Sequence, residues 1–250
     1  MTMRPGLCSV TFRQLAPEQI VVLAAEAELE VIEWGGDVHV PAGDPERAAQ
    51  VAQATADAGL AVCSYGSYFR AGADEALTPI LDSAEALGAD RVRIWAGHVD
   101  SADAAREEYG QVVSRLRDAA AEASERGIGL ALEYHSGTVA DTPDATLRLL
   151  ADVASPALST YWQPSVGAEH AVALAAFDAL AAHTTAVHVF SWWPRTERLR
   201  LHERGALWQG LFAAASALPS PPRDALLEFV PDDDPALLAT EAATLRGWLA

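Results

Sequence analysis

Four short apolar segments of the sequence each end in a side chain of a type that binds metal ions. These side chains are Glu133, Gln163, His188 and Glu228. Helix-like stretches separate the segments, so we expect each to be a strand of one parallel sheet, with the four side chains meeting at neighbouring strand ends. Carboxylate and amide oxygens together with an imidazole suit a divalent cation such as Mn²⁺, Mg²⁺, Co²⁺ or Zn²⁺. The pattern predicts an enzyme that uses a bound metal on a small polar substrate.

The chemistry that such a site supports is proton transfer beside a carbonyl group. A metal held by these residues could chelate a hydroxy-ketone, make the adjacent C–H acidic and stabilise the resulting enediolate. One of Glu133 and Glu228 could take the proton and the other return it. Epimerisation, isomerisation and dehydration all share this first half. The four residues therefore do not distinguish among the three reactions.

Strand-like and helix-like segments alternate along the whole chain and must position these side chains. We expect strands at 7–12, 30–34, 61–64, 91–95, 129–133, 158–161, 186–190 and 225–229. We expect helices at 17–27, 45–58, 73–87, 102–126, 143–153, 168–182, 205–218 and 235–249. Eight strand–helix units in 250 residues predict an α/β fold, a single (β/α)₈ TIM barrel domain over residues 1–250. The alternative, a doubly wound sheet, usually has a glycine-rich phosphate turn after the first strand, and residues 8–15 lack one.

Residues typical of helix ends agree with these boundaries. Three N-cap candidates each precede a proline suited to the first helical turn, namely Asp44, Thr142 and Asp234. Three glycines lie just past expected helix ends, where a left-handed C-cap is common, namely Gly59, Gly88 and Gly127.

Further polar and aromatic residues lie where a barrel of this kind builds its active site, at the C-terminal strand ends and in the loops that follow. The candidate substrate contacts are Arg13, Glu33, His39, Tyr65, His98, His135 and Trp192. Trp192 belongs to a group of tryptophans near strand ends, whose rings suit the C–H faces of a sugar. Loop packing and structural hydrogen bonds are the alternative roles for these residues.

The composition excludes several classes of function. Acidic residues outnumber basic ones 35 to 17, a net charge of −18 that argues against nucleic acid as a partner. The sequence contains no lysine. Schiff-base aldolases and pyridoxal-phosphate enzymes need a lysine amine, so both are excluded.

The location of the protein is predicted from what the sequence lacks. No export signal or apolar run long enough for a membrane helix is evident, so we expect no membrane association. The chain has only two cysteines, Cys8 and Cys63, which argues against a disulfide framework at this length. We therefore expect a cytoplasmic protein.

The strand ends resemble the sugar phosphate isomerase/epimerase family, the TIM barrels similar to xylose isomerase. The resemblance covers nearly the whole chain, and its strongest motifs are LEYHSGT at 132–138, YWQP at 161–164, VHVFSW at 187–192 and LEF at 227–229. In the epimerase branch a Glu, an Asp, a His and a Glu after the last four strands bind one metal, and the two Glu residues move the proton. The resemblance gives these roles to Glu133, Gln163, His188 and Glu228, and it gives a substrate contact to Arg195. It also implies a carbohydrate-like substrate and a possible homodimer.

Two positions depart from the family pattern. Gln163 stands where the family has Asp, and Val166 stands where a His often follows. The Gln removes one negative charge from the cation, so we expect weaker binding and a preference for Mn²⁺, Co²⁺ or Zn²⁺ over Mg²⁺, with Mn²⁺ favoured. We expect a metal-dependent isomerase or epimerase of a sugar, keto-polyol or related hydroxy-carbonyl compound. The alternatives are a dehydratase acting on a keto-polyol and a non-catalytic sugar-binding barrel with a degenerate metal site, while the negative charge opposes an endonuclease of the same fold.

Overall fold

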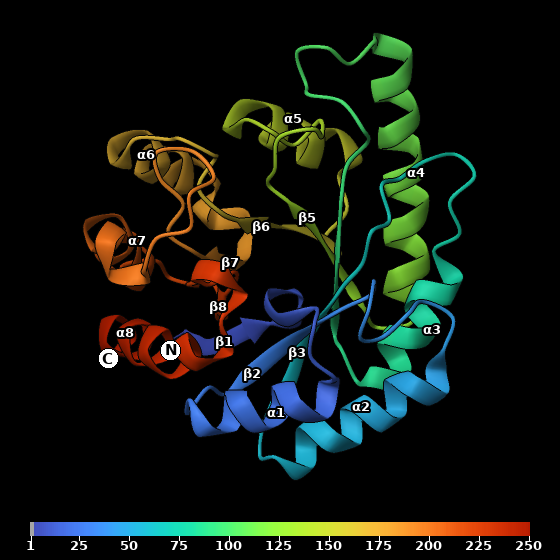
Figure 1. Cartoon of the computed structure of the whole chain (residues 1–250). Helices are drawn as coiled ribbons and strands as arrows, with labels where there is room; N and C mark the ends of the chain where they lie inside the picture. Colours follow the sequence, from blue (N-terminus) through green and yellow to red (C-terminus); the bar gives the residue numbers. More distant parts are fainter. Residues whose placement is uncertain (1–2) are drawn as a thin grey trace.

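A computed structural model, which describes residues 3–250, has eight parallel strands in a closed barrel surrounded by helices (Figure 1). The strands are β1 (Arg4–Cys8), β2 (Val31–Gly35), β3 (Ala61–Gly66), β4 (Arg91–Ile94), β5 (Gly129–Glu133), β6 (Leu158–Trp162), β7 (Thr184–Val189) and β8 (Asp224–Leu227). The helices are α1 (Pro17–Glu26), α2 (Pro45–Asp57), α3 (Thr78–Leu87), α4 (Arg106–Glu125), α5 (Pro143–Val153), α6 (His170–Leu180), α7 (Gly205–Ser216) and α8 (Leu238–Leu249). The predicted (β/α)₈ barrel is confirmed. Among the described residues no helix is long and apolar enough to cross a membrane.

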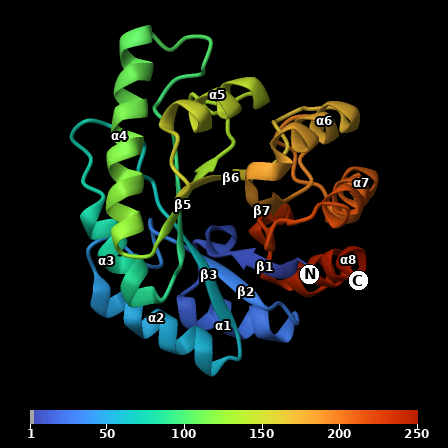
Figure 2. The same cartoon turned by 180° about the vertical axis from the view of Figure 1, so that it is seen from behind.

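The strands pair in sequence order, and β8 closes the barrel against β1. The first strand β1 and the last helix α8 also lie side by side, as the views from the front and from behind agree (Figures 1 and 2). The pairing is regular except for two register shifts, one between Ile32 and Glu33 on β2 and one between Thr160 and Tyr161 on β6. Irregularities of this kind re-aim side chains and are common next to active sites.

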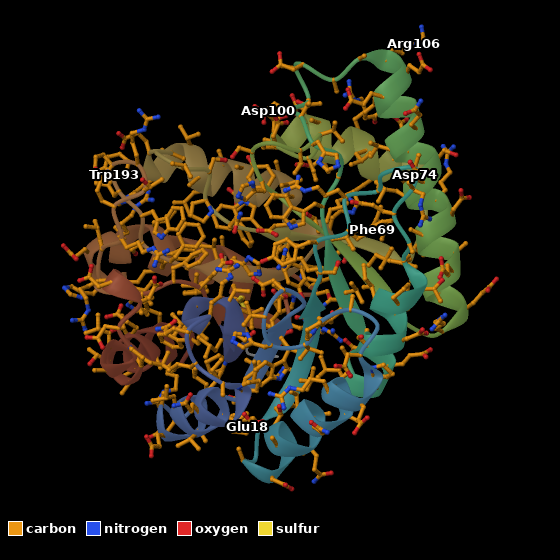
Figure 3. The ribbon with its side chains drawn as sticks, turned by 45° about the vertical axis from the view of Figure 1, so that its right-hand side comes forward. Glu18, Phe69, Asp74, Asp100, Arg106 and Trp193 are labelled. Carbon is orange, nitrogen blue, oxygen red and sulfur yellow. The ribbon has the colours of Figure 1, made fainter. Side chains whose placement is uncertain are left out.

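The barrel interior has three levels, because side chains two residues apart on a strand point to the same side. The middle level is a small apolar cluster formed by Cys8, Val10, Val31, Cys63, Ala131, Tyr161, Ala186 and Leu226. The larger apolar core lies between the barrel and its helices. Charged side chains occupy the barrel interior on both sides of the middle level, toward the C-terminal strand ends and toward the N-terminal strand ends. Figure 3 shows this crowded centre, with Phe69 and Trp193 marking the loops after β3 and β7.

Several element boundaries differ from the prediction. The first strand ends at Cys8, and Ser9–Phe12 forms a 3₁₀ turn instead of strand, because Ser9 Oγ accepts a hydrogen bond from Gly35 N at 2.8 Å. The third helix begins at Thr78, where the sequence predicted residue 73. A turn of 3₁₀ helix, Pro235–Leu237, precedes α8.

The longest helix, α4, also starts later than predicted, at Arg106 rather than residue 102 (Figure 3). The preceding residues are tied to the loop after β5 and do not join the helix. The Asp100 carboxylate accepts a hydrogen bond from Gly137 N at 2.5 Å, and the Asp141 carboxylate accepts one from Ser101 N at 3.1 Å.

The residues predicted to cap helices do lie at the ends of helices or of a 3₁₀ turn. The side chains of Asp44 and Thr142 accept hydrogen bonds from the backbone in the first turns of α2 and α5, and Asp234 caps the 3₁₀ turn before α8. The three glycines past helix ends have φ angles of +77°, +75° and +71°, a left-handed conformation that glycine adopts without the steric cost of a Cβ.

Candidate metal centre

Three of the four predicted metal ligands meet at the C-terminal end of the barrel. Glu133 ends β5, His188 lies near the end of β7, and Glu228 follows β8. One ligand atom from each lies within 4.8 Å of the others, and all three residues are buried. Nδ1 of His188 is 3.5 Å from Glu228 Oε2 and 3.9 Å from Glu133 Oε1. This spacing leaves room for one cation between the three side chains.

Gln163, just after β6, lies against the same group. Its Nε2 donates to Glu133 Oε1 at 3.3 Å, and its Oε1 is 3.3 Å from Nδ1 of His188. The amide oxygen therefore faces the nitrogen and oxygens that would surround a cation. Two carboxylates, an imidazole and an amide oxygen form a donor set that fits a divalent metal.

Arg93 on β4 is a central member of the site that the sequence did not single out. Its guanidinium is buried, with Nε 3.1 Å from Glu33 Oε1 and Nη1 donating to Glu133. The strand-end pattern did not indicate Arg93, because this residue lies within β4 and not after its end. The available signal was the pair Arg91 and Arg93, two charges with the period of two that puts both inside the barrel.

Glu33 lies within β2 and is 2% exposed. Its Oε2 accepts from Ser64 Oγ at 2.7 Å, while its Oε1 lies 3.6 Å from Nε2 of His188 and 3.9 Å from Cys8 Sγ. Cys8, Glu33 and His188 thus form a second grouping with metal-ligand atoms close together. The guanidinium of Arg93 already neutralises Glu33, so this second grouping is poorly suited to another cation.

Negative charge is in excess at the site, because three carboxylates face one guanidinium. Burial raises the pKa of Glu228 to about 7, against the lowering effect of His188 and with a further contribution from Glu133. Burial alone would lower the pKa of His188, but the nearby carboxylates of Glu228, Glu33 and Glu133 raise it to about 9. Protons therefore compensate the excess charge in the metal-free protein. A divalent cation would compensate it in their place.

A cavity of about 270 Å³ opens above these residues. Its floor includes Arg93, Glu133, Gln163 and Glu228. Its walls are largely aromatic and include Tyr68, Trp95, Tyr134, Phe190, Trp192 and Phe229. A concave, mainly apolar pocket with a few convergent polar groups is typical of a small-molecule site.

The backbone conformation at Phe229 explains how the turn after β8 places Glu228 in the cavity floor and Phe229 in the cavity wall. Phe229 has a φ of +58°, a conformation that is unfavourable for a bulky residue. Its N–H donates to Thr11 Oγ1 at 3.1 Å, and the N–H of Glu228 donates to Val189 O at 3.1 Å. These bonds hold the turn so that both side chains face the cavity.

The predicted substrate contacts fall into two groups. Arg13, His135 and Trp192 line the cavity, and the imidazole of His135 packs on Trp95 with ring centroids 4.5 Å apart. Glu33, His39, Tyr65, His98 and Arg195 are not among the described residues that line it.

Local bonds explain the positions of this second group. His39 is buried against Ser9 Oγ at 2.9 Å, and the hydroxyl of Tyr65 donates to Val40 O at 2.7 Å. His98 and Arg195 are exposed on loops. The cavity residues that the sequence missed include Arg93 and the aromatic residues Tyr68, Phe190 and Phe229.

The sequence of residues 21–216 matches the model of one protein family, whose members are described as xylose isomerase-like TIM barrels. The chain belongs to the xylose isomerase-like TIM barrel family. The family predicted from the strand-end motifs is thereby confirmed. Members of the xylose isomerase-like family often use metals, which agrees with the carboxylate and imidazole groups described above.

Several solved structures share the fold at low sequence identity. The probable 3-DHS dehydratase AsbF, involved in petrobactin synthesis in Bacillus anthracis, is 21% identical with a TM-score of 0.78, over 98% of this chain and 99% of that one. A D-psicose 3-epimerase from Clostridium cellulolyticum H10 is 13% identical with a TM-score of 0.73, over 98% of both chains. A xylose isomerase domain containing protein from Salmonella typhimurium LT2 is 14% identical with a TM-score of 0.74, over 99% and 97%. No curated protein matches the sequence.

Proposed function

We propose that the protein is a metal-dependent isomerase or epimerase of a sugar, keto-polyol or related hydroxy-carbonyl compound. The observation that carries the proposal is the position of the Glu133, His188 and Glu228 ligand atoms, within 4.8 Å of one another at the floor of a cavity of about 270 Å³. A cavity of this volume suits a small molecule and not a polymer.

In this proposal Glu133, Gln163, His188 and Glu228 hold the metal, with Mn²⁺ favoured. A bound divalent ion supplies Lewis acidity, which makes the C–H group next to a substrate carbonyl easier to deprotonate. Gln163 contributes a neutral oxygen where the family pattern has a carboxylate. The three carboxylates, counted with Glu33, balance the charge of one divalent ion and one guanidinium.

The two Glu residues differ in a way that suits opposite halves of a proton transfer. Glu133 is ion-paired with Arg93, so we assign it the role of the base that takes the proton from carbon. Glu228 has no arginine partner among the described residues, and burial raises its pKa in the metal-free protein. A carboxylate whose surroundings favour proton uptake in this way suits the group that returns a proton from the other side, and we assign that role to Glu228.

Arg93 and the aromatic walls would bind the substrate. Arg93 lines the cavity, and two of its five N–H groups are used on Glu33 and Glu133. Its remaining N–H groups suit a substrate oxygen, which accumulates negative charge as the neighbouring carbon loses its proton. The rings of Phe190, Trp192 and Phe229, with centroids 5.1–6.5 Å apart, form a wall suited to the C–H face of a polyol and exclude water.

A dehydratase is the second candidate, because the structural similarity to the probable 3-DHS dehydratase has the higher identity and TM-score of the two named enzymes. Dehydration begins with the same proton abstraction. It differs only in the fate of the intermediate, which loses a hydroxyl group in place of regaining a proton.

The test is solvent deuterium incorporation into candidate substrates in D₂O with added Mn²⁺, followed by NMR. The panel contains D-psicose, D-tagatose, L-ribulose and 3-DHS. We expect deuterium at the carbon next to the carbonyl of at least one compound, with an epimer or isomer as product. A product formed by loss of water from the substrate would instead identify the protein as a dehydratase.

Single substitutions assign the proton-transfer roles. We expect Glu133→Gln and Glu228→Gln each to reduce exchange by roughly 10²–10⁴-fold, the usual contribution of a general acid or base. Trp193→Phe is the matched control, because Trp193 follows β7 but is not among the described residues that line the cavity. Exchange that persists in both Glu variants would disprove the acid–base roles, and a protein that binds none of Mn²⁺, Co²⁺, Zn²⁺ and Mg²⁺ would disprove the proposed function.

A further inference from the structure

Oxygen atoms that could accept a hydrogen bond lie near both edges of the His188 imidazole. On the Nδ1 edge are Gln163 Oε1 at 3.3 Å, Glu228 Oε2 at 3.5 Å and Glu133 Oε1 at 3.9 Å. On the Nε2 edge is Glu33 Oε1 at 3.6 Å. Nε2 is buried and makes no hydrogen bond within the described chain. A neutral imidazole carries one N–H, so the two edges compete for it.

Which edge holds the proton decides whether His188 can bind a metal. Only a nitrogen without a proton offers a lone pair to a cation, and the cation position bounded by Glu133 and Glu228 lies on the Nδ1 edge. The proton must therefore be held on Nε2. Metal-bound histidines generally donate their other N–H to a carboxylate, a carbonyl or water, and this partner fixes the orientation of the ring.

Glu33 is the carboxylate that lies 3.6 Å from that edge, and two side chains hold it in position. Arg93 Nε approaches Oε1 at 3.1 Å, and Ser64 Oγ donates to Oε2 at 2.7 Å. The register shift after Ile32 sets Glu33 opposite Ser64 on β3. Gly66 leaves the space that the pair needs, because a Cβ there would lie 2.9 Å from Glu33 Oε1 and 2.8 Å from Arg93 Nη2.

We propose that Glu33 is a positioning residue, whose carboxylate accepts the Nε2 proton of His188 and thereby turns the Nδ1 lone pair toward the cation position. Glu33 itself does not touch the substrate, since it lies below the cavity floor and is not among the described residues that line the cavity. Arg93 and Ser64 keep the carboxylate in place. The proposal rests on the proposed function only in treating His188 as a metal ligand.

The first experiment observes the His188 proton directly. Long-range ¹H–¹⁵N NMR identifies the protonated ring nitrogen, both in the protein loaded with diamagnetic Zn²⁺ and in the metal-free protein at about pH 10.5, where neutral imidazole predominates. We expect the N–H on Nε2 in both samples. In Glu33→Leu without metal we expect the proton to move to Nδ1, where Gln163 and Glu228 accept it.

The second experiment measures Mn²⁺ affinity by calorimetry in two Glu33 variants. Glu33→Leu removes the acceptor at similar volume, and we expect affinity about 10–100-fold weaker, the usual effect of losing such a partner. Glu33→Gln keeps an oxygen acceptor and should recover part of that loss. Glu30→Leu is the matched control, an exposed Glu just before the same strand that should leave affinity unchanged.

A variant that removes no charge separates positioning from electrostatics. Gly66→Ala displaces Glu33 and Arg93 without removing any carboxylate, and we expect it also to weaken Mn²⁺ binding. Circular dichroism checks that each variant is folded.

The outcomes separate this proposal from the proposed function. An N–H on Nδ1 in the wild-type protein, or wild-type Mn²⁺ affinity in folded Glu33→Leu, would overturn the role of Glu33 and leave the metal enzyme standing. Failure of the wild-type protein to bind any metal would overturn the proposed function. The tautomer in the metal-free protein would still test the contact between Glu33 and His188.

Discussion

The barrel contains two buried charged clusters, one at each end, which use similar residues in opposite ways. The floor cluster lies at the N-terminal strand ends, at the opposite end of the barrel from the cavity floor. It consists of the buried Arg91 and Asp224 and the partly exposed Arg4. The site cluster, at the C-terminal strand ends, consists of Glu33, Arg93, Glu133, His188 and Glu228. The apolar middle level separates them.

The floor cluster has more positive than negative charge, and its carboxylate is fully bonded. Asp224 is completely buried, with Oδ1 held by Arg4 Nε at 2.8 Å and Nη2 at 2.7 Å and Oδ2 held by Arg91. Arg91 also donates to Cys63 O at 3.2 Å and Thr185 O at 3.4 Å. No carboxylate there is left without an arginine.

The site cluster has the opposite imbalance and an opening to solvent. Three carboxylates share one arginine, and Glu133 and Glu228 face the cavity. Buried charges that are fully paired hold strands together, whereas buried charges in excess of their partners create a demand for a ligand. The balance of charge therefore distinguishes a structural ion pair from a functional site within one barrel.

The largest expected effect is loss of stability when the floor cluster is broken. Asp224→Asn leaves the buried Arg91 without its carboxylate, and we expect the free energy of unfolding to fall by ~3–5 kcal/mol. Urea denaturation measures it. The control is Asp90→Asn, in an exposed pair with Arg223, with an expected cost below ~1 kcal/mol. If Asp224→Asn weakened Mn²⁺ binding while leaving stability unchanged, the distinction between the clusters would be wrong.

Breaking the site cluster should have the reverse effect. At about pH 8, where Glu228 has lost its compensating proton, Glu228→Gln removes one carboxylate from a buried site with excess negative charge. We therefore expect the metal-free protein to gain a few degrees in Tm at this pH, where 1 kcal/mol corresponds to about 2–4 °C. Mn²⁺ affinity should fall by more than about 100-fold, beyond the usual effect of losing an outer hydrogen-bond partner. Calorimetry provides both measurements. A large loss of stability in this variant would mean that Glu228 is a structural residue like Asp224.

The pH dependence of stability should also trace to the site cluster. In the folded, metal-free protein the pKa of Glu228 is about 7 and that of His188 about 9, both above their unfolded values of about 4.3 and 6.5. The folded state therefore binds protons more tightly. This stabilisation is full below the unfolded pKa values and is lost as pH rises through about 7 and then about 9.

We accordingly expect the Tm in a chelator to fall by several degrees between about pH 5 and pH 9. Saturating Mn²⁺ should reduce that fall, because the cation replaces the protons. Differential scanning calorimetry at a series of pH values tests both statements. A chelated protein whose Tm rises over this interval would contradict the assignment.

The sequence predicted the parts of the molecule that two patterns determine. These are the alternation of strands and helices along the chain and the alternation of side chains within a strand. Helix and strand alternation, caps and length indicated the barrel, and strand-end residues indicated Glu133, Gln163, His188 and Glu228 as neighbours. The alternation of side chains within a strand could also have placed Arg91 and Arg93 inside the barrel, but it does not say which carboxylates they meet. Those partners depend on register across the barrel, as Arg93 on β4 reaches Glu33 on β2.

The substrate contacts were harder to predict, because loops have no periodicity. His39 and Tyr65 have chemistry suited to a site but are used in local hydrogen bonds. Phe190 and Phe229 have no polar group that would mark them as site residues in the sequence, yet they form part of the cavity wall. Their positions depend on how the chain turns after each strand, and the positive φ of Phe229 is an example.

The smallest expected effect concerns Gln163, the member of the site that carries no charge. Gln163→Asp adds a fourth carboxylate to the site cluster, and we expect Mn²⁺ affinity to rise about tenfold, or ~1.4 kcal/mol. The same change should lower the Tm in a chelator, because it increases the uncompensated charge. Gln163→Asn is the matched control, since it has the length of Asp without the charge. If the Asp and Asn variants bind Mn²⁺ equally, Gln163 is not a ligand.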